Sequence, residues 1–450
     1  MDYFTQMENN IPKGHTRTRF APSPTGYMHV GGLRTALYAY LIAKMDGGKF
    51  ILRIEDTDQG RFVEGATEII YKTLTAAGLI YDEGPDVGGP AGPYTQSERR
   101  EIYRKYAERL IKLGGAYIRD DEPGVVRQKI PADGSTSFTD TLFGEVMINN
   151  SELDEGVLIK SDGMPTYNFA NVIDDHLMGI THIVRGTEYL TSTPKYNLLY
   201  QAFGWEIPTY IHVSPVMKNA TQKLSKRNGD PTYEDLLEMG CLKEAVLNYV
   251  ALLGWSPGGE REIFTLSELE EAFTLSGLSK SPAIFNMEKL VWLNGEYIRA
   301  LPFDNFYELA LPYIKKHIKR GVDLREVAKM VQGRCGLLTD IRELTDFIDE
   351  LPEYDRQLFV HKKMKTDVES SVQVLKRVHG VLAKLNNWTA EGIHAAMMGI
   401  VADMGLKTGQ VLYPLRVAVS GKESTPGGGT ELCALLGKEE SLARIEKAVL

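Results

Sequence analysis

A fourteen-residue stretch near the N-terminus, RFAPSPTGYMHVGG from Arg19 to Gly32, leaves few choices for the local fold. Pro22 and Pro24 fix φ and bias the residues before them away from helix, so an extended turn is predicted there. Good helix formers with apolar residues at helical spacing then predict a helix from Leu33 to Met45. The two glycines at its start would expose backbone N–H groups at the positive end of the helix dipole. The stretch therefore predicts a phosphate site.

His29 stands just before the glycine pair, where its imidazole could donate a hydrogen bond to a phosphate lying over the helix N-terminus. Glycine has no Cβ to obstruct that approach. A proline-rich turn followed by glycine is, however, also a common way for a loop simply to enter a helix. The local pattern leaves both interpretations open.

Strands that end in polar loops recur along the first half of the chain. The apolar run 49–54 ends in Glu55-Asp56-Thr57-Asp58 and precedes a predicted helix over 64–77. The strand predicted at 181–184 runs into Arg185-Gly186-Thr187-Glu188, and the one at 209–213 leads to the loop 223–230. Polar residues at the carboxyl ends of parallel strands point into a ligand crevice, although Asp56 or Asp58 could instead cap the helix that follows.

The remaining pattern predicts the fold class: an α/β protein with a Rossmann-type doubly wound parallel sheet, a small α/β insertion, and an all-α C-terminal half. A helix capped by Ser97 is predicted over 97–113, and antiparallel strands follow it. The other predicted elements are strands at 125–130, 143–148 and 156–160, and helices at 193–203, 242–253, 266–273 and 287–293. A flexible loop at 424–430 precedes the last amphipathic helix.

Composition excludes several classes of protein. The net charge of −9 argues against a chain coated in basic residues, although residues 301–450 are close to neutral and contain the basic runs 315–320 and 361–365. Such runs could meet phosphates or could be solvated helix faces. The three cysteines lie far apart, which favours buried free thiols over a disulfide framework or a zinc site. No apolar run is long enough for a membrane span and the first residues do not resemble an export signal, so a cytoplasmic enzyme is expected.

Taken together, the stretch 19–32, the segment IEDTD at 54–58 and the segment KLSKR at 223–227 resemble the bacterial glutamyl-tRNA synthetases, which are class I aminoacyl-tRNA synthetases. The likeness extends over most of the chain. Further similar segments are YDEGPD at 81–86, GPYTQS at 92–97, DGMPTYNFAN at 162–171, DDHLMG at 174–179, LRVAVSG at 415–421 and ALLG at 434–437. This ordered set is far more specific than any one motif.

The resemblance implies a nucleotide site made of two loops. His29-Val30-Gly31-Gly32 stands where the class I signature lies, with Gly32 in place of its second histidine, and the segment 223–227 stands where the second phosphate loop lies. It implies catalytic roles for His29, Gly32, Lys223 and Lys226. The residues implied to bind ATP are Thr25, Gly26, His29, Gly31, Gly32, Glu188, Leu224, Ser225 and Lys226. Mg²⁺ would accompany the ATP, and no structural zinc is expected.

The amino-acid pocket is implied in the same way. A bound glutamate needs a cation for its side-chain carboxylate, because burying that charge alone would cost several kcal/mol, and Arg19 is the residue that the resemblance assigns. Glu55 would hold the α-ammonium group. The other residues implied for this pocket are Ser23, Tyr167, Asn171 and Arg185, and Tyr167 could instead simply pack in the core. Thr57, Asp58 and Arg61 are expected near the tRNA 3′ end, and Arg334 near the last anticodon base.

The resemblance also divides the chain into five parts. These are residues 14–96 and 166–232, the two halves of the catalytic Rossmann domain; 97–165, a connective insertion on the acceptor-stem side; 233–300, a helical stem-contact domain; and 301–450, a helical anticodon-binding domain. Only eight residues separate Tyr117 from Val126, so the insertion is shorter than the family usually has, and it contains no cysteine. The expected partners are tRNA-Glu, L-glutamate and ATP, with no membrane, and the chain is expected to be a monomer.

Two alternatives stay open at this level. The enzyme could also charge tRNA-Gln, or the chain could be a catalytically silent paralogue that binds tRNA. A silent paralogue would be expected to have lost His29, Lys226 or Arg19, and this chain keeps all three.

Overall fold

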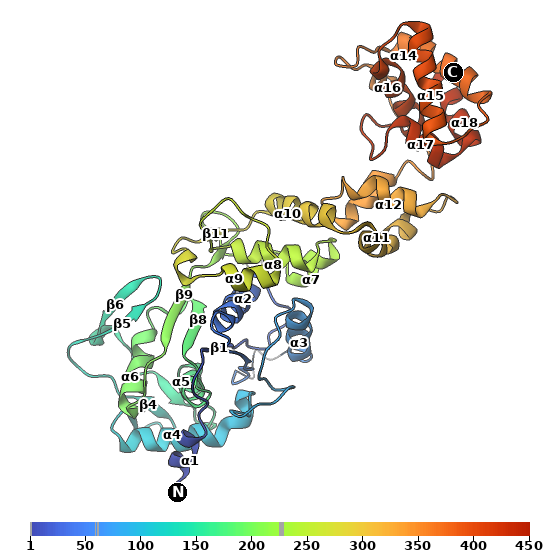
Figure 1. Ribbon diagram of the computed structural model, residues 1–450. Helices are drawn as coiled ribbons and strands as arrows, with labels where there is room; N and C mark the ends of the chain where they lie inside the picture. Colours follow the sequence, from blue (N-terminus) through green and yellow to red (C-terminus); the bar gives the residue numbers. More distant parts are fainter. Residues whose placement is uncertain (1, 59, 61–62, 225–228) are drawn as a thin grey trace. The chain divides into compact units, whose positions relative to one another are not determined.

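The computed structural model describes residues 2–58, 60, 63–224 and 229–450. The chain forms two compact units (Figure 1), the first made of residues 1–238 and 243–290 and the second of residues 239–242 and 291–450. The first unit is α/β and the second is helical, as the sequence predicts. The finer division into five parts remains a prediction.

A six-stranded sheet forms the centre of the first unit. Its strands stand in the order β2 (Lys49–Leu52), β1 (Arg17–Phe20), β8 (His182–Gly186), β9 (Thr209–Val213), β5 (Ser135–Asp140) and β6 (Gly144–Asn149). The first five strands pair in parallel, and only the β5–β6 pair is antiparallel. The carboxyl ends of β2, β1, β8 and β9 therefore meet at one edge of the sheet.

Helices cover both faces of this sheet, and the pleat of β1 directs neighbouring residues to opposite faces. Thr18 donates its hydroxyl to the carbonyl of Ala39 in α2 (Val30–Lys44), at 2.7 Å. Arg19, the next residue, bonds instead to Asp175 in α5 (Tyr167–Leu177). Because β1 ends one residue later, the Arg19 side chain lies beneath the carboxyl edge of the sheet.

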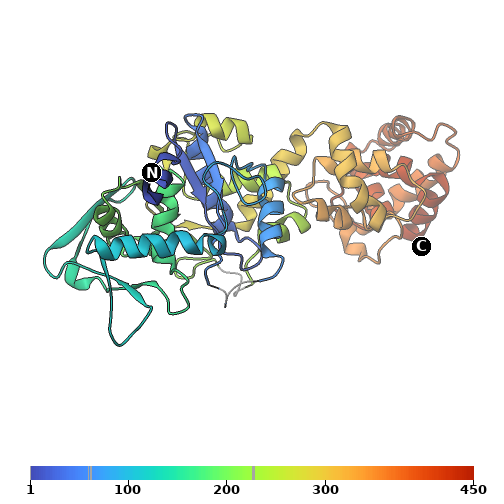
Figure 2. The ribbon, with the colours of Figure 1, turned by 90° about the horizontal axis from the view of Figure 1, so that it is seen from below.

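A second core lies under α4 (Arg100–Lys112), α5 and α6 (Thr193–Phe203). The N-terminal helix α1 (Tyr3–Asn9) lies beside α4 (Figures 1 and 2), where the Phe4 ring meets the edge of Tyr106 at a centroid distance of 5.2 Å. A small antiparallel sheet of β3 (Ala116–Ile118), β4 (Val126–Gln128) and β7 (Val157–Ile159) joins this core. The short stretch after Tyr117 is thus the loop of the β3–β4 hairpin.

The insertion predicted at 97–165 is joined to the six-stranded sheet more closely than the sequence suggests. The strand β5, which the sequence pattern does not predict, pairs in parallel with β9 at Asp140 and Tyr210. The β5–β6 hairpin thereby becomes one edge of the six-stranded sheet. The pattern failed here because β5 has the sequence STSFTD, in which Phe138 is the single large apolar residue.

Three helix starts differ from the expectation. The helix α2 begins at Val30, with His29 as its N-cap, so both glycines lie inside its first turn. The helix α3 (Ala66–Ala76) is preceded by Gly65 as its N-cap, so neither Asp56 nor Asp58 caps it. Asp56 instead accepts the backbone N–H of Ser97 at 2.8 Å, where a 3₁₀ turn over Gln96–Arg99 precedes α4 and replaces the predicted Ser97 cap.

The first unit closes with α7 (Tyr233–Glu238), α8 (Lys243–Leu252), α9 (Leu266–Ala272) and the short β10–β11 pair (Val216–Met217 and Ala283–Ile284). The helix α10 (Met287–Ala300) begins in this unit and continues into the second. The helices of the second unit are α11 (Phe303–His317), α12 (Leu324–Gln332), α13 (Ile341–Thr345), α14 (Val368–Ala383), α15 (Ala390–Met404), α16 (Thr408–Ser420), α17 (Gly429–Leu436) and α18 (Lys438–Val449). Within the described ranges, no helix is both long and apolar enough to cross a bilayer.

Candidate active site

A cavity of about 680 Å³ opens at the carboxyl edge of the sheet. Segments that follow β1, β2, β8 and β9 all contribute to its wall, as the topology requires. The predicted site residues that line it are Arg19, Ser23, His29, Gly31, Gly32, Glu55, Thr57, Asp58, Tyr167, Arg185, Glu188, Lys223 and Leu224. Ten further lining residues are not among the predicted site residues, namely Phe20, Ala21, Arg34, Thr35, Val184, Gly186, Tyr189, Val213, Pro215 and Val216.

Other predicted residues are placed differently. Thr25, Gly26 and Asn171 are not among the lining residues, and the Asn171 side-chain amide donates to the carbonyl of Tyr167 at 2.6 Å. Arg334 belongs to the second unit. Arg61, Ser225 and Lys226 lie outside the described residues. For all of these, the predicted roles remain predictions.

His29 organises the start of α2. Its Nδ1 accepts the backbone N–H of Gly32 at 3.2 Å, so a hydrogen bond from this ring to a phosphate would come from Nε2. A Cβ at position 31 would lie 3.0 Å from His29 Cε1, tighter than almost any contact made by real Cβ atoms. At position 32 the corresponding contact, with Met28 Cγ, would be 3.3 Å. Glycine at 31 therefore leaves the imidazole room to fold over the helix N-terminus.

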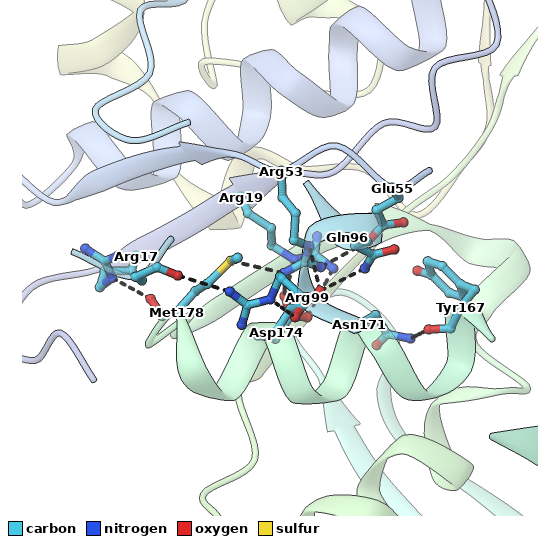
Figure 3. A network of polar contacts seen from close by, with 12 residues as sticks. Arg17, Arg19, Arg53, Glu55, Gln96, Arg99, Tyr167, Asn171, Asp174 and Met178 are labelled. Carbon is cyan, nitrogen blue, oxygen red and sulfur yellow. Dashed lines mark hydrogen bonds and ion pairs between the residues drawn. The ribbon is translucent and has the colours of Figure 1, made fainter. Parts of the chain in front are cut away.

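Arg19 is buried and held rigidly (Figure 3). Its Nε and Nη2 donate to the two carboxylate oxygens of Asp175 at 3.0 and 3.3 Å, and Nη1 donates to the carbonyl of Val184 at 3.2 Å. Burial alone would raise the pKa of Asp175, but Arg19 and Arg53 outweigh it and hold that pKa below its usual range. Because a guanidinium carries five N–H donors, Nη1 and Nη2 each keep one N–H that pairs with no atom of the described residues.

Arg19 belongs to a larger buried network that the sequence reasoning did not identify. Arg53 is fully buried and donates to Asp175 at 2.7 Å, and Asp174 accepts from Arg99 at 2.7 Å (Figure 3). Gln96 and Tyr103 complete the shell of Asp174. Two adjacent aspartates that follow the apolar residues Val172 and Ile173 in this helix are the signal that could have revealed it, since acidic residues are rarely fully buried unless they are paired.

Glu55 lies at the other end of this network, on the cavity wall. Its carboxylate accepts from Arg53 Nη2 at 3.1 Å, and only 6% of the residue is exposed. Burial raises the pKa of Glu55 to about 7, although Arg53 and Arg19 act in the opposite direction. The carboxyl group is thus poised to ionise when a cation arrives beside it.

Arg185 is another buried arginine on the cavity wall, and its surroundings contrast with those of Arg19. Its Cζ lies 4.8 to 5.3 Å from the ring centroids of Tyr189, Tyr196 and Tyr210. No carboxylate of the described ranges lies within ion-pair distance of it, and its buried Nη1 has no hydrogen-bond partner there. Because a buried charge without a counter-ion is costly, this site favours an anion beside Nη1.

Tyr167 stands at the cavity wall between these charges. Its ring packs against Tyr189 with a centroid distance of 5.2 Å, and it is only partly buried. Its place on the wall favours the binding interpretation over simple core packing.

The three cysteines are buried free thiols, as predicted. Among the residues that the structure describes, no group of three or more His, Cys, Asp or Glu could hold a metal ion.

In the second unit, Arg334 lines a separate cavity of about 300 Å³ together with Asp340, Glu343 and Lys422. Lys422 donates to the carbonyl of Glu343 at 2.7 Å and pairs with Asp346 at 2.6 Å. In the two basic runs of this unit, Lys315, Lys316, Lys362 and Lys363 are exposed.

Comparison with known proteins gives consistent results. The family described as tRNA synthetases class I (E and Q), catalytic domain, matches residues 15–124 and 118–292, and an anticodon binding domain family matches residues 305–449. A glutamate–tRNA ligase of Clostridium botulinum (strain Hall) is 54% identical over 96% of this chain and 97% of the relative, and one of Clostridium kluyveri is 53% identical over the same shares.

Solved structures agree with this likeness. A glutamate tRNA ligase from Elizabethkingia meningosepticum, crystallised in complex with its amino acid, superposes with a TM-score of 0.88 at 34% identity, covering 97% of this chain and 99% of that one. A glutamate-tRNA synthetase from Elizabethkingia anophelis gives the same TM-score at 33% identity, covering 97% of this chain and all of that one.

Proposed function

The chain belongs to the glutamate–tRNA ligases of the class I aminoacyl-tRNA synthetases, and from that premise we propose how its cavity activates L-glutamate with ATP and passes it to the 3′ end of tRNA-Glu. One observation carries the proposal. Arg19 and His29, from the stretch 19–32, line the same cavity as Lys223, which lies far along the sequence. That cavity therefore combines a carboxylate anchor with two phosphate-binding segments.

The reaction has two steps. An α-carboxylate oxygen of glutamate attacks the α-phosphorus of ATP, the bond from that phosphorus to the bridging oxygen breaks, and pyrophosphate leaves. A terminal ribose hydroxyl of the tRNA then attacks the acyl carbon, loses its proton, and displaces AMP. Neither step requires a covalent nucleophile from the protein, so catalysis rests on alignment and on neutralising charge that develops on phosphate oxygens.

The geometry supports a glutamate bound between two fixed cations and one carboxyl group. The remaining N–H groups of Arg19 suit a planar carboxylate, and the buried Nη1 of Arg185 offers a further donor to the substrate. Glu55 would receive the α-ammonium group, since a neighbouring cation favours its charged form. Ser23 and Tyr167 complete this pocket on the cavity wall, and Asn171 supports it from α5.

The proposed nucleotide site lies at the start of α2. His29, Gly31 and Gly32 would receive phosphate oxygens at the positive end of the helix dipole, and Lys223, which lines the same cavity, would supply a cation to them. Ser225 and Lys226, which lie outside the described residues, are proposed to bind the phosphates as well. ATP would bind as its magnesium complex. Glu188 and Leu224 would contact the nucleoside portion, and Thr25 and Gly26 would shape the approach to it.

The tRNA would be bound by both units. Thr57, Asp58 and Arg61 are proposed to meet its 3′ end, and the helical second unit, which matches an anticodon-binding family, to meet its anticodon. Arg334 is proposed to contact the last anticodon base from its small cavity. We further propose that the enzyme is monomeric, acts in the cytoplasm, and needs no structural zinc.

Charging assays on separated tRNAs test the proposal. The purified chain, incubated with ATP, labelled glutamate and tRNA-Glu, is expected to form glutamyl-tRNA. Label on tRNA-Gln as well would identify a non-discriminating enzyme, and tRNA binding without any charging would identify a silent paralogue. Replacing Arg334 with alanine is expected to raise the charging of tRNA-Gln relative to tRNA-Glu, and an unchanged ratio would contradict the role proposed for this residue.

A further inference from the structure

A chain of buried polar residues that do not line the cavity adjoins Arg185. His212 stands beside Arg185 in the β8–β9 register and is fully buried. Arg185 Nε donates to His212 Nε2 at 3.0 Å, and His212 Nδ1 lies 2.7 Å from Asp140 Oδ2. Thr193 at the start of α6 accepts from Arg185 Nη2 at 2.6 Å. Two of the three guanidinium nitrogens thus donate to residues that do not line the cavity.

The donors and acceptors in this chain define one tautomer of His212. Because Arg185 Nε–H can only donate, His212 Nε2 must accept, and the ring proton must therefore be on Nδ1, where it donates to Asp140. Burial lowers the pKa of His212, Asp140 opposes that effect and Arg185 adds to it, so the ring is neutral. A protonated ring would direct an N–H against the N–H of Arg185.

Asp140 is itself fixed by the backbone. One carboxylate oxygen accepts the N–H groups of Leu142 and Phe143 at 2.9 Å each, and the other accepts the backbone N–H of His212 at 3.0 Å. These donors hold the carboxylate at the end of β5 without help from its ring partner. The Thr193 hydroxyl is fixed likewise, because it donates to the carbonyl of Tyr189 at 2.8 Å.

We propose that His212 and Thr193 are positioning residues that hold the Arg185 guanidinium so that its unpartnered Nη1 faces a carboxylate of the amino-acid substrate. They contact neither substrate themselves and act only through Arg185. The tyrosine rings around Arg185 restrict its position but, lacking directional acceptors, do not set its rotation. This inference rests on the proposed glutamate pocket and adds to it the groups that aim its second cation.

Two matched pairs of variants test the inference. His212→Gln can keep an acceptor near the place of Nε2 while losing the contact with Asp140, and His212→Asn can keep a donor near Nδ1 while losing the acceptor for Arg185. Thr193→Val removes the hydroxyl at nearly constant shape, and Thr193→Ser keeps it. His212→Asn and Thr193→Val are expected to raise the KM for glutamate about tenfold or more in tRNA charging, with the KM for ATP within twofold of wild type. His212→Gln and Thr193→Ser should stay within about threefold for both substrates.

A purely structural role would give a different pattern. Equal losses in His212→Asn and His212→Gln, or parallel changes in the KM for glutamate and ATP, would overturn the inference. If the His212 variants do not fold, as judged by thermal unfolding, the Thr193 pair decides alone. Absence of glutamate charging by the wild-type chain would refute the proposed function itself, and is therefore distinguishable from failure of the positioning role.

Discussion

Replacing Glu55 with glutamine is expected to stabilise the ligand-free protein above pH 7. The carboxyl group has its pKa raised from 4.5 to about 7 because it is buried. At about 1.36 kcal/mol per unit, that displacement corresponds to about 3 kcal/mol of folding free energy. The stability is present below pH 4.5, where folded and unfolded chains both carry the proton, and is lost as the pH rises through 7. Glutamine is neutral at every pH, so the variant does not lose this stability as the pH rises.

Thermal unfolding at pH 5.0 and pH 8.5 measures this difference. At pH 8.5 the first unit of the glutamine variant should unfold at a temperature about 5–10 °C above that of wild type. The transition of the first unit is identified as the one whose melting temperature rises when glutamate and ATP are added. At pH 5.0 the difference should fall to about a quarter of its value at pH 8.5, because a carboxyl group with a pKa of 4.5 is already mostly ionised in the unfolded chain. Glu206→Gln is a matched control, because Glu206 is exposed in the same unit. A variant no more stable than wild type at pH 8.5, or a gain of equal size at both pH values, would refute the reasoning.

The same ionisation predicts a pH dependence of substrate binding. If Glu55 receives the α-ammonium group, its proton must leave before glutamate binds productively. The KM for glutamate in wild-type charging should therefore rise up to tenfold per pH unit below about pH 7, and the KM for ATP should not follow it.

Substitutions at three other positions test the pocket and its support. Arg19→Ala should abolish glutamate charging while ATP still binds, as measured by the fluorescence of a labelled ATP analogue. Arg19→Lys should not restore charging, because lysine lacks the planar guanidinium fork of arginine. Unchanged charging kinetics would contradict the role assigned to Arg19. His29→Ala should lower kcat about 10²-fold or more and cost about 1 kcal/mol as a lost N-cap, whereas His29→Asn should recover the stability but not the rate; equal recovery of both would separate His29 from the chemistry. Asp175→Asn should destabilise the first unit by about 3–5 kcal/mol because it leaves Arg19 and Arg53 without their shared carboxylate; a melting temperature within 2 °C of wild type would exclude that role.

The sequence predicts those parts of the fold whose signals are local. The helix over 193–203 and the strand over 209–213 have the predicted bounds, because each combines its own periodicity with clear ends. The start of α2 was predicted three residues late, since two glycines in a first turn contradict helix propensity and are tolerated there because His29 caps the helix.

The sequence predicts the cavity-lining residues that belong to motifs, and not the buried partners that hold them. Asp175 and His212 come from segments far from Arg19 and Arg185, and no local pattern couples an aspartate inside a helix to an arginine on a distant strand. Burial of such groups is decided by tertiary pairing. The same holds for β5, which is a strand because β6 and β9 flank it and not because of its own composition.

The way the insertion joins the sheet has a practical meaning for protein engineering. Its two hairpins do not tolerate sequence changes equally. The β3–β4 loop, residues 119–125, is exposed to solvent and is the natural place to lengthen, shorten or graft sequence. The β5–β6 hairpin closes one flank of β9, and its removal would uncover a row of backbone hydrogen-bonding groups that invites pairing with another chain. A version of this protein cut down to its Rossmann core would therefore have to keep residues 135–149 or face aggregation along that edge.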